Sequence, residues 1–342
     1  MRDVIIIGAG PAGSSLAYYL AKEGIDVLLI DRAHFPRYKP CAGAFSVSLE
    51  SLFDFSLKGV IESTHSSMIF KKNRKEFKLL FDFPVIHLVN RKYFDYLLLK
   101  KALECGASIS EGVKAIEIKK NRVITDSGDF EGNIIVGADG GGSLVRRHGN
   151  YKRTKTWLKT ISADITSDKY NEIIFDFSWT KRWYAWIFPK KNTLSIGLGD
   201  HPKNLKEGEK VLRKFLDYYN LPYPEKTYKY TYPLFSSPEP LSWRNTILIG
   251  DAAALSNPVS GGGIYNSIES AYIASRVIKL NLSRGIPLTY YQRLLNRHFF
   301  PMLTISGIFN CLFIKKPIEI LKAGKFFFYW LTKHFSSDKP PF

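Results

Sequence analysis

Cysteine is scarce in this chain of 342 residues. The three cysteines, Cys41, Cys105 and Cys311, lie far apart and form no CxxC pair. The seven histidines show no HExxH or similar ligand spacing. We therefore expect neither a disulfide framework nor a structural metal site.

Long hydrophobic runs are also missing. A predominantly apolar uncharged stretch near the end of the chain, residues 299–314, covers 16 residues and contains Pro301 and Gly307. At about 1.5 Å per residue, a helix of that length is shorter than the ~30 Å hydrocarbon core of a bilayer, so we expect no membrane span. Asp3 precedes a strand-like run at the amino terminus, which argues against a secretory signal and favours a cytoplasmic protein.

Acidic residues are outnumbered, with 31 Asp and Glu against 49 Lys and Arg and a formal charge of +18. Such a surface favours anionic partners, including acidic lipid headgroups and acidic electron-transfer proteins. A proteome that is basic throughout would explain the charge equally well. The basic residues lie in short scattered blocks and form no basic stripe interleaved with aromatic residues, so we expect no nucleic acid partner.

The first 31 residues carry a β-α-β pattern. Val4–Ile7 is a β-branched run typical of a buried strand, and Gly8, Gly10 and Gly13 follow in the GxGxxG spacing. A predicted helix and a second buried strand ending at Asp31 complete the unit. Gly8 would permit the turn, Gly10 would let the backbone approach a pyrophosphate, and Gly13 would allow close packing of helix and strand. Asp31 would accept a hydrogen bond from a ribose hydroxyl.

Two further buried strands lead into glycine-rich turns later in the chain. These segments are Ile134–Gly140 and Asn245–Asp251, and the second precedes Pro258 and the glycine run 261–263. Between them, residues 151–241 alternate aromatic and polar residues, as is typical of an antiparallel sheet. The pattern predicts an α/β domain with a sheet domain inserted in it.

We predict three parts for the chain. A discontinuous cofactor domain comprises residues 1–66, 85–150 and 242–285, a sheet domain comprises 67–84 and 151–241, and a helical segment comprises 286–342.

Three polar residues near the cofactor domain have simple structural explanations when taken alone. Cys41, in a proline- and glycine-rich loop, is most simply a small buried hydrophobe. Arg91 and Asp95 lie one turn apart in a predicted helix, where an exposed ion pair would contribute only about 0.3–0.5 kcal/mol.

Taken together, the three strand-to-glycine junctions resemble those of flavoproteins with the p-hydroxybenzoate hydroxylase fold. Lys39-Pro40-Cys41-Ala42-Gly43 and Tyr184-Ala185-Trp186-Ile187-Phe188-Pro189 further resemble the K-x-C-G-G loop and the Y-x-W-x-F-P strand of the geranylgeranyl reductase family. Ala42 stands where that family usually has glycine. The resemblance covers roughly residues 1–285 and implies an α/β fold: a Rossmann-like FAD-binding domain, an antiparallel β-sheet substrate domain and C-terminal helices.

The resemblance implies that FAD is the cofactor. It implies that Asp139 helps to hold the fold and FAD, that Asp251 binds the ribityl or pyrophosphate region, and that the glycine run after Pro258 lies along the isoalloxazine. Arg91 matches an arginine that contacts FAD in relatives. The implied cofactor residues are Gly8, Gly10, Ala12, Gly13, Asp31, Arg32, Lys39, Cys41, Ala42, Gly43, Arg91, Val113, Asp139, Gly140, Gly250, Asp251, Pro258, Gly261, Gly262, Gly263 and Ile264.

The implied activity is reduction of isolated double bonds in a prenyl chain of the geranylgeranyl type, carried by a lipid or related isoprenoid. An isolated alkene is a poor hydride acceptor, so the reaction needs a hydride from reduced flavin N5 at one carbon and a proton at its neighbour. Tyr184, Trp186 and Phe188 alternate along a predicted strand, share one face, and would bind the chain and stabilise cationic character. Ordinary sheet packing is the alternative explanation for these rings. Cys41 and Tyr184 are the candidate catalytic residues.

No second GxGxxG follows a strand, so the electrons would come from transiently docked NAD(P)H or from a reduced ferredoxin-like protein. The C-terminal residues 290–342 mix aromatic and basic side chains, which suits peripheral contact with the anionic cytoplasmic face of a membrane. A helical cap on the substrate domain would explain them as well.

Two other functions are compatible with the same features. An FAD-dependent aromatic monooxygenase would use the same fold, and a non-catalytic flavin- or lipid-binding protein would need only the binding residues. A flavin halogenase is disfavoured, because its W-x-W-x-I-P pattern would require Trp in place of Tyr184 and Ile in place of Phe188.

Overall fold

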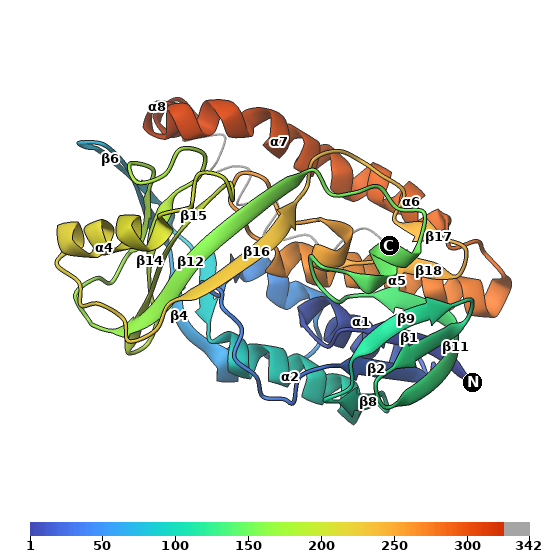
Figure 1. Ribbon diagram of the computed structural model, residues 1–342. Helices are drawn as coiled ribbons and strands as arrows, with labels where there is room; N and C mark the ends of the chain where they lie inside the picture. Colours follow the sequence, from blue (N-terminus) through green and yellow to red (C-terminus); the bar gives the residue numbers. More distant parts are fainter. Residues whose placement is uncertain (325–342) are drawn as a thin grey trace. The chain divides into compact units, whose positions relative to one another are not determined.

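A computed structural model describes residues 1–324, which form two compact units (Figure 1). The first unit contains residues 1–38, 92–156 and 232–307. The second contains residues 39–91, 157–231 and the chain from 308 onward. Residues 39–66 and 85–91 thus group with the second unit, although the sequence assigned them to the cofactor domain, and residues 286–307 group with the first.

The first unit is built on an eight-stranded sheet with β1 near its middle. Its strands are, in spatial order, β17 (Ser242–Trp243), β18 (Thr246–Leu248), β11 (Gly128–Gly137), β1 (Arg2–Ile7), β2 (Val27–Asp31) and β8 (Ser108–Glu111), with β10 (Arg122–Thr125) and β9 (Ala115–Lys119) attached to β11. β1 pairs in parallel with both β2 and β11, and β11 pairs in parallel with β18. The predicted buried strands at residues 4–7 and 134–136 are therefore confirmed.

Helices accompany this sheet, and α1 and α5 lie beside it in Figure 1. The helices of the first unit are α1 (Pro11–Ala21), α2 (Arg91–Glu104), α3 (Leu144–His148), the 3-10 helix η3 (Gly250–Ala253), α5 (Ile264–Arg284), α6 (Tyr290–Leu294), the π-helical η4 (Leu295–Phe299) and the start of α7 (Phe300–Lys315). α1 packs against α5. Strand β8 was not predicted, because the sequence Ser108-Ile109-Ser110-Glu111 carries little hydrophobic signal.

The second unit contains a seven-stranded sheet and a three-stranded sheet. The larger sheet has the order β16 (Tyr228–Leu234), β12 (Thr156–Thr166), β15 (Thr193–Asp200), β14 (Ala185–Pro189), β13 (Ile173–Asp176), β5 (Ser67–Lys72) and β6 (Lys75–Leu80). The smaller has the order β3 (Ala44–Ser46), β7 (Ile86–Val89) and β4 (Ile61–His65). Short helices η1 (Val47–Leu52), η2 (Lys58–Val60), α4 (Gly208–Tyr219) and α8 (Pro317–Ala323) complete the unit.

Most pairings in the larger sheet are antiparallel, as predicted, but β13 pairs with β5 in parallel. The two strands are far apart in the sequence, so no tight turn forces them into opposite directions. One face of the sheet is covered by α4, whose Leu212, Phe215 and Leu216 pack on Ile187 and Ile196. The other face therefore carries the remaining side chains of these strands.

The length argument against a membrane span is wrong. Helical structure continues from Tyr290 to Lys315, a total of 26 residues, because the π-helical turn η4 just before Pro301 changes the hydrogen-bond pattern there without ending the helix. Within residues 1–324 this is the one helix long and apolar enough to cross a membrane, by length and composition alone.

Candidate functional site

The three strand-to-glycine junctions meet at one edge of the eight-stranded sheet. Ile7 is level with Ile30 on one side and with Gly137 on the other, and Gly137 is level with Leu248. Since these strands are parallel, their carboxyl ends share an edge, which is where open α/β sheets bind ligands. The turns that follow β1, β2, β11 and β18 therefore converge.

Two glycines of the first turn are required by geometry. Gly8 has a φ of +102°, and a Cβ there would lie 2.4 Å from the carbonyl oxygen of Ala138. A Cβ on Gly13 would lie 1.9 Å from the carbonyl oxygen of Gly8. The predicted tight turn at Gly8 and close helix–strand packing at Gly13 are both confirmed.

The turn ends in a helix whose first N–H groups are available to an anion. α1 begins at Pro11 with Gly10 as its N-cap residue, so Ala12 and Gly13 lie in the first turn. Asp31 accepts hydrogen bonds from the backbone N–H of Ala9 (2.7 Å) and of Ala33 (2.9 Å). Each carboxylate oxygen keeps a second lone pair, so Asp31 can still accept from a ribose hydroxyl.

Arg37 also reaches this turn, although the sequence did not single it out. Its Nη2 lies 3.1 Å from Oδ2 of Asp95, whose side chain is fully buried, and 3.6 Å from the position that a Cβ on Gly10 would occupy. Its Nη1 is buried and has no hydrogen-bond partner within residues 1–324. A guanidinium with an unused nitrogen beside an anion-binding turn fits a pyrophosphate.

Asp139 lies just after β11 and caps α3. Its Oδ2 accepts from the backbone N–H of Leu144 (2.6 Å). Burial raises the pKa of Asp139, and its Oδ1 is buried without a partner in the described part of the chain. Asp139 therefore uses one oxygen to cap α3, and its second oxygen is available to a ligand donor.

The glycine run uses part of its own backbone to close a loop. The N–H of Gly261 donates to the carbonyl of Asn257 (2.9 Å), and the N–H of Gly262 donates to Oγ of Ser260 (3.1 Å). No hydrogen bond within residues 1–324 uses the N–H groups of Gly263 or Ile264, where α5 begins. These two amides, rather than those of Gly261 and Gly262, are therefore the ones available to a cofactor.

Asp251 is held beside the same helix start. Ser256 Oγ donates to its Oδ1 (2.8 Å), and a Cβ on Gly263 would lie 3.1 Å from that oxygen. Val113, another predicted cofactor residue, donates its N–H to the carbonyl of Asp31 (3.0 Å), and Arg32, the residue after Asp31, is exposed. The first unit thus gathers backbone amides, three aspartates and a guanidinium at one sheet edge, a donor and acceptor set that fits FAD.

The remaining predicted residues belong to the second unit. These are Lys39, Cys41, Ala42, Gly43, Arg91, Tyr184, Trp186 and Phe188. The structure rules out the simple explanation of Arg91 and Asp95 as an exposed ion pair, because Arg91 is 8% exposed and Asp95 is fully buried. Burial follows because Asp95 turns toward Arg37, a partner that the spacing of the helix residues could not reveal.

The Cys41 loop is packed against the aromatic strand. Gly43 has a φ of +77°, its N–H donates to Sγ of Cys41 (3.4 Å), and its carbonyl accepts from the N–H of Val89 (3.0 Å). Ala42 packs against a cluster that includes Trp186 and Phe188. The loop therefore holds Cys41 beside the face that carries the aromatic rings.

Three aromatic rings form a row along β14 and the residue before it. The ring centroids of Tyr184 and Trp186 are 6.3 Å apart, and those of Trp186 and Phe188 are 6.4 Å apart. Burial, followed by the nearby Cys41 thiol, raises the pKa of Tyr184 far above its usual value. The indole N–H of Trp186 is buried and finds no acceptor among the described residues. The prediction that these three rings share a face is confirmed.

An ion pair with a buried lysine follows this row. Nζ of Lys190, whose side chain is 3% exposed, lies 3.2 Å from Oδ1 of Asp164. Burial raises the pKa of nearby Glu62, the charge of Asp164 adds to the rise, and Lys190 opposes it. Sequence reasoning missed these residues, because Lys190 and Asp164 meet only when β14, β15 and β12 pair.

Known proteins support the cofactor and the fold. The FAD binding domain family matches residues 1–184, so FAD is the cofactor. An uncharacterised protein of Methanosarcina barkeri is 35% identical over 295 residues, covering 83% of this chain and 76% of that protein. Digeranylgeranylglycerophospholipid reductase of Methanosarcina acetivorans is 30% identical over 315 residues, with 83% and 76% covered.

A solved structure has the same fold. It is a geranylgeranyl bacteriochlorophyll reductase-like protein of Thermoplasma acidophilum, with a TM-score of 0.82 and 20% identity over 98% of this chain and 92% of that one. Family match, sequence relatives and fold agree with the glycine junctions and the FAD-compatible sheet edge. This chain belongs to the geranylgeranyl reductase family of FAD-dependent oxidoreductases, within the p-hydroxybenzoate hydroxylase fold.

Proposed function

We propose that this protein hydrogenates isolated double bonds in a prenyl chain carried by a lipid or a related isoprenoid. The observation that carries this proposal is the row of Tyr184, Trp186 and Phe188 with the Cys41 loop packed on the same face. The names of its relatives, which include a digeranylgeranylglycerophospholipid reductase, favour the same substrate class.

The aromatic row would bind the chain and exclude water. Trp186 is 6% exposed and Phe188 is 4% exposed, so both rings are shielded from water. A hydrocarbon chain bound against them would contact an apolar surface. Their ring faces would stabilise cationic character that develops at an alkene carbon. When bound and reduced, FAD supplies the hydride equivalent for this chemistry.

Cys41 and Tyr184 would supply the proton that the alkene accepts. The phenol of Tyr184 is protonated at neutral pH, as any tyrosine is, and burial raises its pKa further, so Tyr184 holds this proton at Oη more firmly than an exposed tyrosine would. Cys41 lies close enough for its charge to affect that pKa, so the two side chains form one local pair. We assign delivery of the proton to this pair, with Cys41 as the catalytic residue that contacts the alkene.

The test of the function is an anaerobic single turnover. Protein reduced with dithionite is mixed with a geranylgeranyl lipid, and we expect flavin reoxidation together with a product heavier by two hydrogens. Stable reduced flavin and unchanged lipid would favour the non-catalytic binding protein instead. NAD(P)H oxidation coupled to oxygen consumption and hydroxylation of an aromatic compound would favour the monooxygenase.

Replacing Cys41 separates catalysis from cofactor binding. We expect Cys41→Ala to retain FAD and lose alkene reduction by about 100-fold, the lower range for a positioned proton donor. Cys105→Ala is the matched control, because Cys105 is also a free, partly exposed thiol and lies at the end of α2. Rates are read from product mass in single turnover, and full activity of Cys41→Ala would remove Cys41 from the mechanism.

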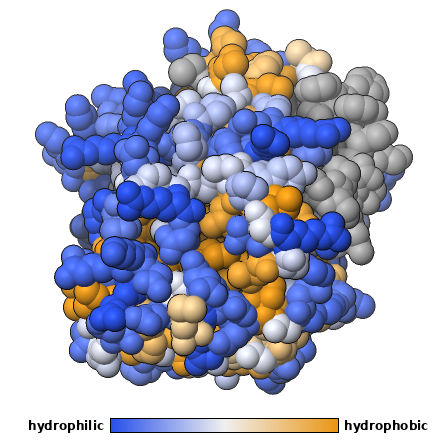
Figure 2. All heavy atoms as spheres, turned by 90° about the vertical axis from the view of Figure 1, so that its right-hand side faces the viewer, coloured by the Kyte–Doolittle hydropathy of each residue, from blue (hydrophilic) through white to orange (hydrophobic). Residues whose placement is uncertain are grey.

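We also propose that the electrons reach FAD from a donor that docks on the protein surface. A second proposal is that the protein contacts a membrane peripherally. Figure 2 shows a face covered largely by hydrophilic side chains with hydrophobic areas between them. With a formal charge of +18, such a surface suits an acidic ferredoxin-like protein or NAD(P)H. Flavin reduction by NADPH at the turnover rate, unaffected by ferredoxin, would exclude the protein donor.

A further inference from the structure

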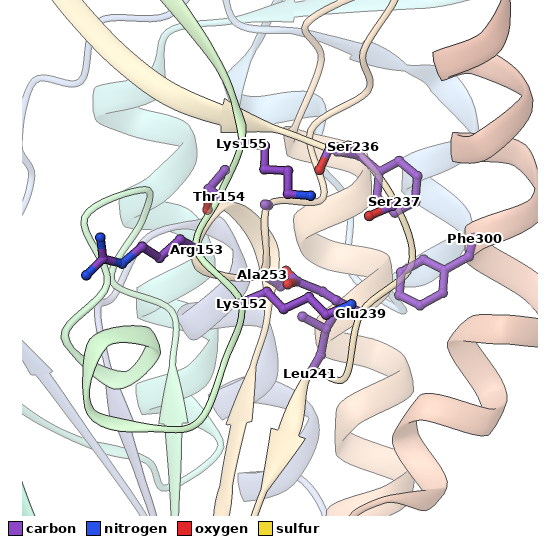
Figure 3. Close-up of a pocket in the computed structure, with 12 residues that line it drawn as sticks. Lys152, Arg153, Thr154, Lys155, Ser236, Ser237, Glu239, Leu241, Ala253 and Phe300 are labelled. Carbon is purple, nitrogen blue, oxygen red and sulfur yellow. The ribbon is translucent and has the colours of Figure 1, made fainter.

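A pocket in the first unit lies outside the residues assigned to FAD and substrate (Figure 3). Its walls come from residues 152–155, which follow α3, and from the loop after β16. Its floor includes Ala253 at the end of η3, Leu241 and Phe300, all of them buried. The pocket therefore combines an apolar floor with polar walls.

The walls of this pocket carry a surplus of positive charge. Lys152, Arg153 and Lys155 line it, and none of the three forms an ion pair with any residue of the described chain, 1–324. Its one carboxylate, Glu239, is already paired with Nη1 of Arg146 at 2.8 Å. An anion that entered would thus meet cations that form no ion pair with a carboxylate of the described chain.

Arg146 adds charge behind the wall and holds the pocket together. This side chain is 9% exposed, its Nε donates to the carbonyl of Ala252 (2.8 Å), and its Nη1 donates to the carbonyl of Lys152 (2.7 Å). Its Nη2 is buried and has no partner anywhere in residues 1–324. One buried guanidinium therefore joins both walls to the floor and keeps an unused donor.

The direction of the side chains distinguishes the three cations. In Figure 3 the Lys155 side chain extends toward the loop that carries the hydroxyls of Ser236 and Ser237, and the guanidinium of Arg153 points away from that loop. The Lys152 side chain runs along the pocket toward Glu239. Two ammonium groups and two hydroxyls thus face the space, while Arg153 does not.

We propose that this pocket binds the phosphate group of a small molecule. Ammonium and hydroxyl groups are the donors that phosphate oxygens accept, and charge-assisted hydrogen bonds are the stronger class. The apolar floor would contact the uncharged part of the same molecule. A nucleotide, a phosphorylated lipid headgroup and free phosphate share this chemistry, and binding here requires nothing of the proposed reaction.

The test is binding of inorganic phosphate to the FAD-loaded protein at low salt, measured by isothermal titration calorimetry. We expect saturable binding that Lys155→Gln and Lys152→Gln each weaken by about tenfold. Arg153→Gln, which removes the same charge from the same segment, should change the affinity by less than about twofold. Each variant must retain FAD, so that the cofactor's own phosphate site stays filled.

Two results would overturn the proposal. One is absence of saturable binding to the wild type. The other is equal weakening by Arg153→Gln and Lys155→Gln, which would indicate only general surface charge.

Competition experiments then identify the molecule that carries the phosphate. Displacement by NADPH but not NADH indicates a nucleotide phosphate, displacement by vesicles containing phosphatidic acid indicates a lipid headgroup, and displacement by neither indicates free phosphate. Because no turnover is measured, failure here is distinguishable from failure of the reductase proposal.

Discussion

A single buried carboxylate explains how Arg37 comes to lie at the glycine turn. Asp95 is fully buried on α2, and its pairing with Nη2 of Arg37 fixes the guanidinium within reach of Gly10. Arg32, from the same basic loop, is exposed and has no such anchor in the described interactions. Arg32, directly after Asp31, was predicted to contact FAD. In the structure Arg37 is the arginine held at the glycine turn, because it pairs with the buried Asp95.

Removing Arg37 should weaken FAD binding and stability together. Arg37→Met would remove one charged partner of the buried Asp95, which costs up to about 3 kcal/mol in the free energy of unfolding. The variant Arg37→Met with Asp95→Leu removes the buried carboxylate as well, so we expect it to regain most stability but not FAD affinity. Urea unfolding and FAD titration measure the two effects, and wild-type FAD affinity in either variant would exclude Arg37 from the cofactor site.

Glu269 on α5 should make stability depend on pH. Burial raises the pKa of Glu269 to about 7, above the value near 4.5 expected in the unfolded chain. The folded state therefore holds this proton more tightly, and stability is lost as the pH rises from about 4.5 through 7.

Glu269→Gln removes this ionisation. We expect the variant to gain up to about 3 kcal/mol of stability relative to the wild type at pH 8, and to gain little at pH 4.5. Urea unfolding at the two pH values measures the difference. An equal difference at both would show that Glu269 does not titrate between them.

At the scale of elements, β14 and β15 of the second unit have complementary side chains: a tryptophan on one strand packs over a glycine on the other. Trp186 on β14 is level with Gly197 on β15, and a Cβ on Gly197 would lie 2.4 Å from a carbon of the indole ring. The indole thus occupies the space that a side chain on β15 would fill. The aromatic row depends on this glycine as well as on its own residues.

Gly197→Ala tests this match. We expect the added methyl group to displace the indole or the Ile161 carbonyl, 2.6 Å away, and to cost about 1–3 kcal/mol. Gly199→Ala is the control on the same strand and face, because its Cβ would meet other atoms at 3.4 Å or more. Urea unfolding and the tryptophan emission spectrum report the change, and equal effects of the two variants would contradict the match.

Hydrophobic patterns predicted the elements that are long and strongly periodic. A strand ending at Asp31 and a helix containing Arg91 and Asp95 were predicted, and β2 and α2 match them, because each segment has continuous apolar residues or a helical spacing of them. β8 and the parallel pairing of β13 with β5 were not predicted. Neither depends on local periodicity, since each exists only because a distant strand supplies its hydrogen-bond partners.

At the scale of the whole molecule, α7 exposes an apolar row. Ile305, Ile308, Phe309 and Leu312 are 56%, 69%, 51% and 60% exposed, and their spacing places them on one side of the helix. Lys315 and Lys316 follow at its end. An apolar row ending in basic residues suits an anionic membrane surface, and the aromatic and basic residues predicted to help, 325–333, lie outside the described residues.

Ile308→Asp should therefore weaken membrane binding. We expect less co-sedimentation of the variant than of the wild type with anionic liposomes at low salt, because a carboxylate would face lipid and repel its headgroups. Ile116→Asp is the control, since Ile116 is 53% exposed but lies on β9. Equal sedimentation of wild type and Ile308→Asp would exclude this helix as the contact.

The sequence by itself determined the cofactor unit and the aromatic row. A buried strand, a GxGxxG turn and an acidic strand end act over a few consecutive residues, and alternation along one strand places Tyr184, Trp186 and Phe188 on one face. Only the tertiary structure decided which charged groups pair with one another beside these features. Arg37 with Asp95, Lys190 with Asp164, and Arg146 with Glu239 are each far apart in the chain. They meet because burying a charge is costly unless an opposite charge accompanies it, and folding brings such partners together.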